Sequence, residues 1–148
     1  MADAGTIKQL LRIAQAARSA LQRYVSDTQD FMFDSFPRGT CGPVSELLGR
    51  YLMEAGFKDV MYVCGERQDK GSHAWLEVGG IVLDITGDQF GQPPVVVAAT
   101  SKWHGEWERE EPRPPICTQR QWPAYPFGAW GAMKAGIDAS FVASGLRR

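Results

Sequence analysis

Residues 73–86 read HAWLEVGGIVLDIT, and this stretch decides the fold of the chain. It contains two runs, 73–78 and 81–86, that are rich in the apolar, β-branched and aromatic residues typical of strands. Between them stands the pair Gly79-Gly80, which accepts the left-handed backbone of a two-residue hairpin turn without strain. The stretch therefore predicts an antiparallel β-hairpin.

A two-residue turn also sets which residues of the hairpin lie opposite each other. Val78 faces Ile81, and counting back along both strands places Trp75 opposite Asp84 and His73 opposite Thr86. Opposite residues and residues two apart share a face, so one face carries His73, Trp75, Glu77, Val82, Asp84 and Thr86. His73 and Asp84 become diagonal neighbours with Cβ atoms roughly 7 Å apart, within reach of an imidazole–carboxylate hydrogen bond. An odd bulge would destroy this register.

Two helices are predicted before the hairpin. In residues 6–25 the apolar positions recur at helical spacing, and Lys, Arg and Gln occupy the rest of the cylinder. A second helix should begin near Cys41, capped by Thr40 or by Cys41 itself, because Pro43 suits a first turn. Gly56 is a typical helix-ending glycine.

The remaining segments are strand-like or irregular. Residues 60–64 and 95–98 have strand character, residues 101–130 are rich in Pro and Trp with little periodicity, and residues 129–146 predict a short helix. Strand-period segments that follow two helices, without an alternating βαβ pattern, indicate an α+β fold with an antiparallel sheet.

Length and charge narrow the classes of protein. A chain of 148 residues usually makes one domain. We divide it into an N-terminal helix and loop (1–38), a catalytic core (39–100) and a Trp/Pro-rich C-terminal wrap (101–148). The net charge is −1 and no basic stripe is present, which argues against a nucleic-acid partner.

Other features bear on the compartment. No stretch approaches the ~18 apolar residues that cross a bilayer, and an acid stands at the N-terminus where a signal peptide needs basic residues. The number of cysteines is odd, and the spacings between Cys41, Cys64 and Cys117 match no zinc or redox motif. These features predict a cytoplasmic, reduced protein without a membrane partner.

Cys41 is the candidate nucleophile. A thiol in the first turn of a helix lies near unpaired N–H groups and the positive end of the helix dipole, and both favour the thiolate. Gly42 leaves room for a substrate carbonyl, and the same N–H groups could stabilise an oxyanion. The alternative is a buried structural cysteine.

His73 and Asp84 supply the other parts of such a site. The imidazole would take the thiol proton and return it to the leaving amine, while the carboxylate fixes the imidazole tautomer. Asp84 stands between Leu83 and Ile85, where an unpaired charge would be costly. Taken singly, either residue is as well explained by a structural role.

The motif His-Ala-Trp-x-Glu at 73–77, followed by Asp-x-Thr at 84–86, resembles the core motif of the transglutaminase-like superfamily of papain-like cysteine enzymes. That family places its nucleophilic cysteine at the start of a preceding helix, as at Cys41. The resemblance covers about residues 39–90. It implies a papain-like core with the nucleophile helix packed on a small antiparallel sheet. It also implies Cys41 as nucleophile, His73 as base, Asp84 as third member and Trp75 as a packing residue.

The chain departs from the family pattern in three respects. The hairpin is shorter than in large transglutaminases, and there is no room for their calcium-binding and accessory domains. No glutamine stands shortly before Cys41, so the second oxyanion donor is unassigned, with Gln89 as one candidate.

Several further residues have more than one candidate role. His104, in an aromatic segment, is expected on a surface loop, with substrate contact or replacement of His73 as alternatives. Asp88 could replace Asp84. A metal site of histidines and cysteines lacks recognised ligand spacing, so no metal or other cofactor is expected. One aromatic set predicts either a lid over the sheet or a peptide groove: Trp103, Trp107, Trp122, Tyr125 and Trp130.

These inferences together predict a cysteine-dependent hydrolase. It would cleave a peptide or side-chain amide of a peptide or protein partner through a thioester. The alternatives are a transglutaminase or deamidase acting on protein glutamine, an arylamine-type acyltransferase, and a non-catalytic binding module. A non-catalytic binding module would be expected to lack at least one triad residue, whereas all three are present in this sequence.

Overall fold

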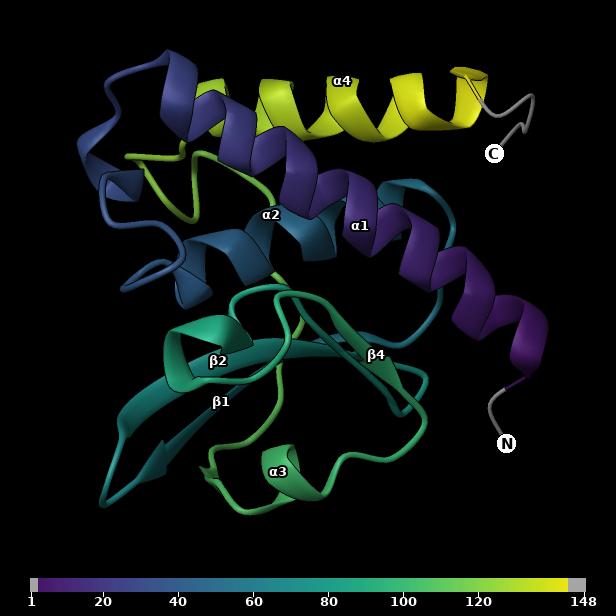
Figure 1. Ribbon diagram of the computed structural model, residues 1–148, viewed down its shortest axis with the longest axis vertical. Helices are drawn as coiled ribbons and strands as arrows, with labels where there is room; N and C mark the ends of the chain where they lie inside the picture. The colour runs from purple at the N-terminus through teal and green to yellow at the C-terminus, as the bar shows by residue number, and fades with distance from the viewer. Residues whose placement is uncertain (1–2, 144–148) are drawn as a thin grey trace.

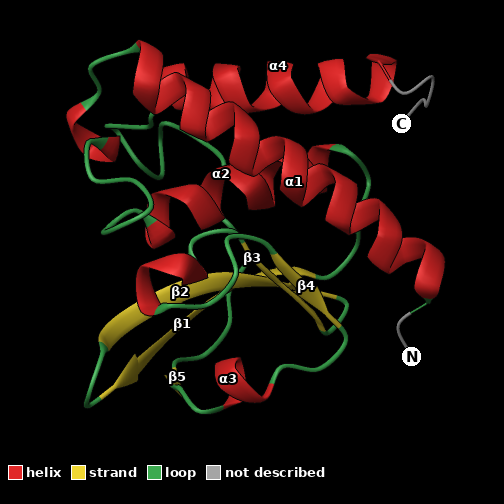
Figure 2. Cartoon of the chain, in the orientation of Figure 1, coloured by secondary structure: helices red, strands yellow, loops and turns green. Residues whose placement is uncertain are grey.

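The computed structural model describes residues 3–143 and contains a small antiparallel sheet with most of its helices on one face. In Figure 1, helix α2 lies between the sheet and an outer pair of helices, α1 and α4, while the short α3 lies on the opposite face. Figure 2 shows the same separation of helices and strands. The α+β prediction with an antiparallel sheet is confirmed at this level.

The two predicted N-terminal helices are present. Helix α1 spans Ala4–Asp27, and the carboxylate of Asp3 accepts the N–H groups of Gly5 and Thr6. Helix α2 spans Cys41–Glu54, so its first residue is the candidate nucleophile. Thr40 is its N-cap residue, but the hydroxyl donates to the carbonyl of Pro37 and makes no capping bond. The first N–H groups of α2 therefore lack a side-chain cap.

The five strands form one sheet in the order β4-β3-β2-β1-β5, with every pair antiparallel. The predicted hairpin is its centre, with a turn in which Gly79 and Gly80 have φ of 56° and 84°. Only glycine adopts these values readily at both positions of a tight turn. The strands are β1 (Val60–Arg67), β2 (Gly71–Val78), β3 (Ile81–Asp84), β4 (Val96–Ala98) and β5 (Glu108–Arg109).

The register of the hairpin is the predicted one. Val78 pairs with Ile81 and Leu76 pairs with Leu83, without a bulge. Strand β3 ends at Asp84, two residues earlier than predicted, because the chain then bends toward the 3-10 turn η2 (Gly87–Phe90). Beyond Asp84 the edge of β2 is therefore no longer covered by β3.

The C-terminal third differs most from expectation. Residues 101–130 are mainly irregular but contain α3 (Lys102–Gly105) and β5. Helix α4 (Phe127–Ala143) is longer than the short helix predicted, and residues 144–146 of that prediction lie outside the described residues. A further 3-10 turn, η1 (Phe31–Phe33), precedes α2. None of the helices in the described part of the chain has the length and apolar character needed to cross a bilayer.

Two apolar cores lie on the two faces of the sheet. The larger fills the space between the sheet and helices α1, α2 and α4, and the smaller consists of Val63, Trp75, Val82 and Trp107. The predicted aromatic set is divided between them. Trp107 belongs to the smaller core and Trp103 packs against it, whereas Tyr125 and Trp130 belong to the larger core and Trp122 packs against that one. The set is therefore neither a single groove nor a single lid.

Candidate active site

His73 and Asp84 form the hydrogen bond that the hairpin register predicts. Nε2 of His73 lies 2.7 Å from Oδ2 of Asp84, and both residues are buried. The other carboxylate oxygen accepts the backbone N–H of Thr86 at 2.9 Å. The bend after β3 thus satisfies the carboxylate that the hairpin buries.

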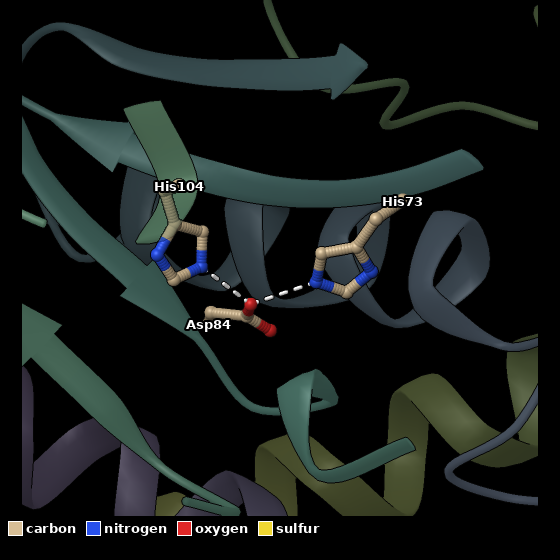
Figure 3. Close-up of side chains that lie close together, drawn as sticks. All are labelled: His73, Asp84 and His104. Carbon is tan, nitrogen blue, oxygen red and sulfur yellow. Dashed lines mark hydrogen bonds and ion pairs between the residues drawn. The ribbon is translucent and has the colours of Figure 1, made fainter. Parts of the chain in front are cut away.

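A second imidazole binds the same carboxylate oxygen. Nε2 of His104 lies 2.7 Å from Oδ2 of Asp84, and Figure 3 shows the carboxylate between the two histidine rings. His104 comes from α3 and is 2% exposed. The expectation of a surface-loop histidine was therefore wrong. The reason is that the segment after β4 crosses to the smaller core and buries His104 against Trp75 and Trp103.

The hydrogen bonds favour one protonation pattern for this cluster. The Ser101 hydroxyl lies 2.6 Å from Nδ1 of His104 and can donate to it, which leaves Nε2–H of His104 to donate to Asp84. Nε2–H of His73 donates to the same oxygen. Nδ1 of His73 is buried and lacks a partner among the described residues, so it is the ring nitrogen left to receive a proton.

Cys41 lies close enough to His73 for the two groups to affect each other's ionisation. Burial raises the pKa of the Cys41 thiol, but His73 and the backbone N–H groups of Ala74 and Gly42 outweigh this, so the pKa is lowered overall. The resting thiol and Nδ1 are neighbours without a standard hydrogen bond. Catalytic hydrogen bonds are commonly long before substrate binds.

His73 and Asp84 are shifted in the complementary directions. Burial opposes the charge on His73, but Asp84 and then Cys41 raise its pKa to about 9. Burial also opposes the charge on Asp84, yet hydrogen bonds from His104 and His73 hold its pKa well below the ordinary range. The three pKa shifts therefore all favour the charged forms: a thiolate, an imidazolium and a carboxylate.

Aromatic rings surround His73 and keep water from it. The centroids of Phe90, Trp75, Trp107 and Trp103 lie 5.1–5.8 Å from that of the imidazole. Trp75, predicted as a packing residue, is fully buried beside His73. In such surroundings the hydrogen bonds of the cluster are stronger than they would be in water.

His73, Asp84 and His104 are also the described residues that could hold a metal ion, since their ligand atoms lie within 4.8 Å of one another. The spacing fits direct hydrogen bonds better. A tetrahedral ion with bonds of about 2.0 Å separates its ligand atoms by about 3.3 Å, whereas each nitrogen lies 2.7 Å from the same oxygen. Asp84 Oδ2 would have to lose both donors to admit an ion.

Gln89 braces the segment before Cys41. Its Nε2 donates to the Thr86 carbonyl at 3.0 Å, and its Oε1 accepts the N–H of Gly39 at 3.4 Å. It links the bend after Asp84 to the loop that leads into α2. The Gln89 amide is thus already engaged at both ends, whereas Gly42 lies beside the thiol, as expected.

Asp88, the proposed substitute for Asp84, is bound elsewhere. Arg18 of α1 donates to both Asp88 oxygens, at 2.7 and 2.8 Å, and to the carbonyl of Ile85 at 2.8 Å. The sequence predicted only a packing role for the first helix. The local sequence carried no signal of this contact, because the Arg residues of this helix were expected outside its apolar face, whereas Arg18 is buried.

Cys64 and Cys117 differ from Cys41. Burial raises the pKa of each thiol, and nearby acids raise that of Cys64 further. All three cysteines are free and partly buried. Cys41 is thus distinguished by its ionisation rather than by its exposure.

No protein-family model, curated protein or solved structure matches this chain, so the arrangement of residues is what bears on function.

Proposed function

We propose that this protein is a cysteine-dependent hydrolase that cleaves an amide bond of a peptide or protein through Cys41, His73 and Asp84. The observation that carries the proposal is the coupling of a thiol with a lowered pKa to a buried imidazole held by a carboxylate. A nucleophile, a base and an orienting group in this order suit nucleophilic acyl transfer.

The reaction would proceed in two halves. Nδ1 of His73 takes the proton of Cys41, and the thiolate attacks the carbonyl carbon of the amide. The imidazolium returns the proton to the departing amine, which leaves a thioester on Cys41. Water, deprotonated by His73, then attacks the thioester and releases the acid and the thiol. The uncapped N–H groups at the start of α2 are the nearest donors for the oxyanion.

The finer fold assignment belongs to the same proposal. A helix that starts at the nucleophile and packs on an antiparallel sheet, with the base and the carboxylate on adjacent strands, supports a papain-like core of the transglutaminase-like kind. This likeness would allow water or an amine as the acceptor. We favour water as the acceptor.

The first test measures the rate of Cys41 alkylation by iodoacetamide against pH, by peptide mapping of all three cysteines. Cys41 is expected to react fastest near pH 7, because its pKa is lowered while those of Cys64 and Cys117 are raised. In His73→Gln this advantage should disappear. A Cys41 that is inert, or indifferent to His73, would leave a binding module as the better interpretation.

A second test distinguishes hydrolysis from transfer. Once an amide substrate is found, hydroxylamine is added at increasing concentration, and the ratio of acid to hydroxamate product is measured. A hydrolase yields mainly acid at low hydroxylamine. A transglutaminase-like enzyme diverts most of the thioester to hydroxamate at the same concentration.

A further inference from the structure

A pocket of about 270 Å³ begins at Gly42, the residue that follows the nucleophile. Its walls are partly aromatic and aliphatic, and it is bounded by Pro43, Glu46, Tyr62, Ile116, Gln121 and Trp122. The smaller aromatic core covers His73 on the other face of the sheet. The pocket adjoins the thiol side of the candidate site, because Gly42 directly follows Cys41.

Tyr62 of β1 forms the wall next to the thiol. A Cβ placed on Gly42 would lie 3.4 Å from the Tyr62 hydroxyl oxygen, so that oxygen is adjacent to the backbone that carries Cys41. The hydroxyl makes no hydrogen bond to the residues that the structure describes. Burial is the largest cause that raises the pKa of Tyr62, followed by the negative charges of Cys64, Glu46 and Cys41, so the phenol remains a proton donor at neutral pH.

Arg113 holds the Tyr62 ring in this position. The guanidinium lies 4.0 Å from the ring centroid, and the two backbones exchange N–H···O bonds of 2.6 and 3.1 Å. Arg113 is fixed in turn by Glu46, with bonds of 2.6 and 3.2 Å to its two carboxylate oxygens. A donor whose position is held before substrate binds is the kind that stabilises a developing oxyanion.

The same ion pair removes the net charge from the pocket. Glu46 is buried, and one oxygen also accepts the N–H of Ile116 at 2.8 Å. Neither charge is left to select an ionic ligand. Tyr62 and Trp122, with Pro43 and Ile116, offer apolar surface instead.

We propose that this pocket is the acyl-side substrate site, which takes an uncharged aromatic or branched aliphatic side chain next to the attacked carbonyl, and that the Tyr62 hydroxyl donates to the carbonyl oxygen. The inference rests on the proposed function and adds its substrate class and second oxyanion donor. It assigns to Tyr62 the role for which the sequence offered Gln89.

Peptide aldehydes test this without a known substrate. The Cys41 sulfur forms a bond to the aldehyde carbon, the C=O π bond becomes a C–O bond, and the thiol proton ends on that oxygen. The product is a reversible hemithioacetal that resembles the tetrahedral intermediate. Its formation is measured by protection of Cys41 from iodoacetamide.

The probes are the α-aldehydes of N-acetylated phenylalanine, leucine, glycine and glutamic acid. We expect the phenylalanine and leucine probes to protect Cys41 at concentrations about tenfold lower than the glycine and glutamic acid probes need, because the pocket buries their apolar side chains. Tyr62→Phe should weaken the phenylalanine probe by up to about tenfold through loss of one hydrogen bond to the hemithioacetal oxygen. Trp122→Ala should reduce the preference for phenylalanine over glycine.

Alkylation in the absence of aldehyde is the control. Iodoacetamide displaces iodide at carbon and forms no oxyanion, so Tyr62→Phe should change that rate less than about twofold. Equal protection by all four aldehydes, or an unchanged affinity in Tyr62→Phe, overturns the inference while His73-dependent alkylation still supports the hydrolase. If alkylation does not depend on His73, the proposed function fails and the inference fails with it.

Discussion

Asp84 receives two imidazole donors on one carboxylate oxygen and a backbone donor on the other. Its pKa is held below the ordinary value of 3.8, so the Asp84 carboxylate stays ionised in the folded protein at pH values where the same group in the unfolded chain takes up a proton. The stability that Asp84 contributes is therefore fully present above about pH 4 and is lost as the pH falls below it.

Asp84→Asn should remove this acid dependence. Below about pH 3.8, one proton of difference between the unfolded and folded states changes the free energy of unfolding by about 1.4 kcal/mol per pH unit. The variant should be less stable than the wild type at neutral pH. Its free energy of unfolding should also depend less steeply on pH in this acid range, by about 1.4 kcal/mol per pH unit. Urea unfolding at several values between about pH 5 and 3 measures it. Parallel slopes for both proteins would show that Asp84 is not held ionised.

His104 gives the second prediction at this scale. His104→Leu removes one donor from a buried carboxylate, and we expect a loss of roughly 2–4 kcal/mol in the free energy of unfolding. His104→Gln is the matched control, because its amide can again donate to Asp84. Chemical denaturation at pH 7 should rank the wild type above the Gln variant and the Gln variant above the Leu variant. Equal losses in both variants would point to packing alone.

At the scale of the element, the close contact between α2 and the irregular C-terminal segment depends on Gly49. A Cβ at Gly49 would come within 2.8 Å of Pro115 Cβ and closer still to its Cγ, and a proline ring cannot rotate away. Gly49→Ala should therefore cost about 1–3 kcal/mol by overpacking, although alanine favours helix.

Gly131 in α4 supplies the comparison. It is exposed, and an added Cβ would meet nothing within 4 Å. Gly131→Ala should stabilise the protein by up to about 1 kcal/mol through helix propensity. Thermal or urea unfolding of the two single variants tests both values. A stabilising Gly49→Ala would mean that Pro115 does not pack on α2 in solution.

Elements with a strong local signal were predictable from the sequence. The Gly79-Gly80 turn has one favoured geometry, so the hairpin register and the meeting of His73 with Asp84 followed from counting residues. The start of α2 followed from Pro43. The catalytic roles of these residues remain predictions.

His104 was beyond such reasoning. It lies 20 positions after Asp84 in the chain, and a four-residue helix leaves no repeat to detect. The contact of Arg18 with Asp88 spans 70 residues and depends on how α1 crosses the sheet. Long-range contacts of this kind are set by tertiary packing, which no local pattern encodes.

At the scale of the whole molecule, the two faces of the sheet are unequally covered. Three helices pack over one face, whereas the other face is covered by the four-residue helix α3 and by the aromatic side chains of Phe90, Trp103 and Trp107. Regions with few backbone hydrogen bonds and little covering structure open first. Hydrogen exchange followed by mass spectrometry should therefore show faster exchange in residues 101–109 than in α2. Equal protection would mean that the two faces open together.

The position of Cys41 ahead of its partners in the chain has a consequence for biosynthesis. A ribosome delivers the thiol 32 residues before His73 and 43 residues before Asp84, and the helix that carries it can form earlier than the sheet. During that interval the cysteine lacks the imidazole that lowers its pKa and behaves as an ordinary thiol. The lowered pKa therefore appears only when the hairpin has closed, so a nascent or truncated chain carries Cys41 as an ordinary thiol.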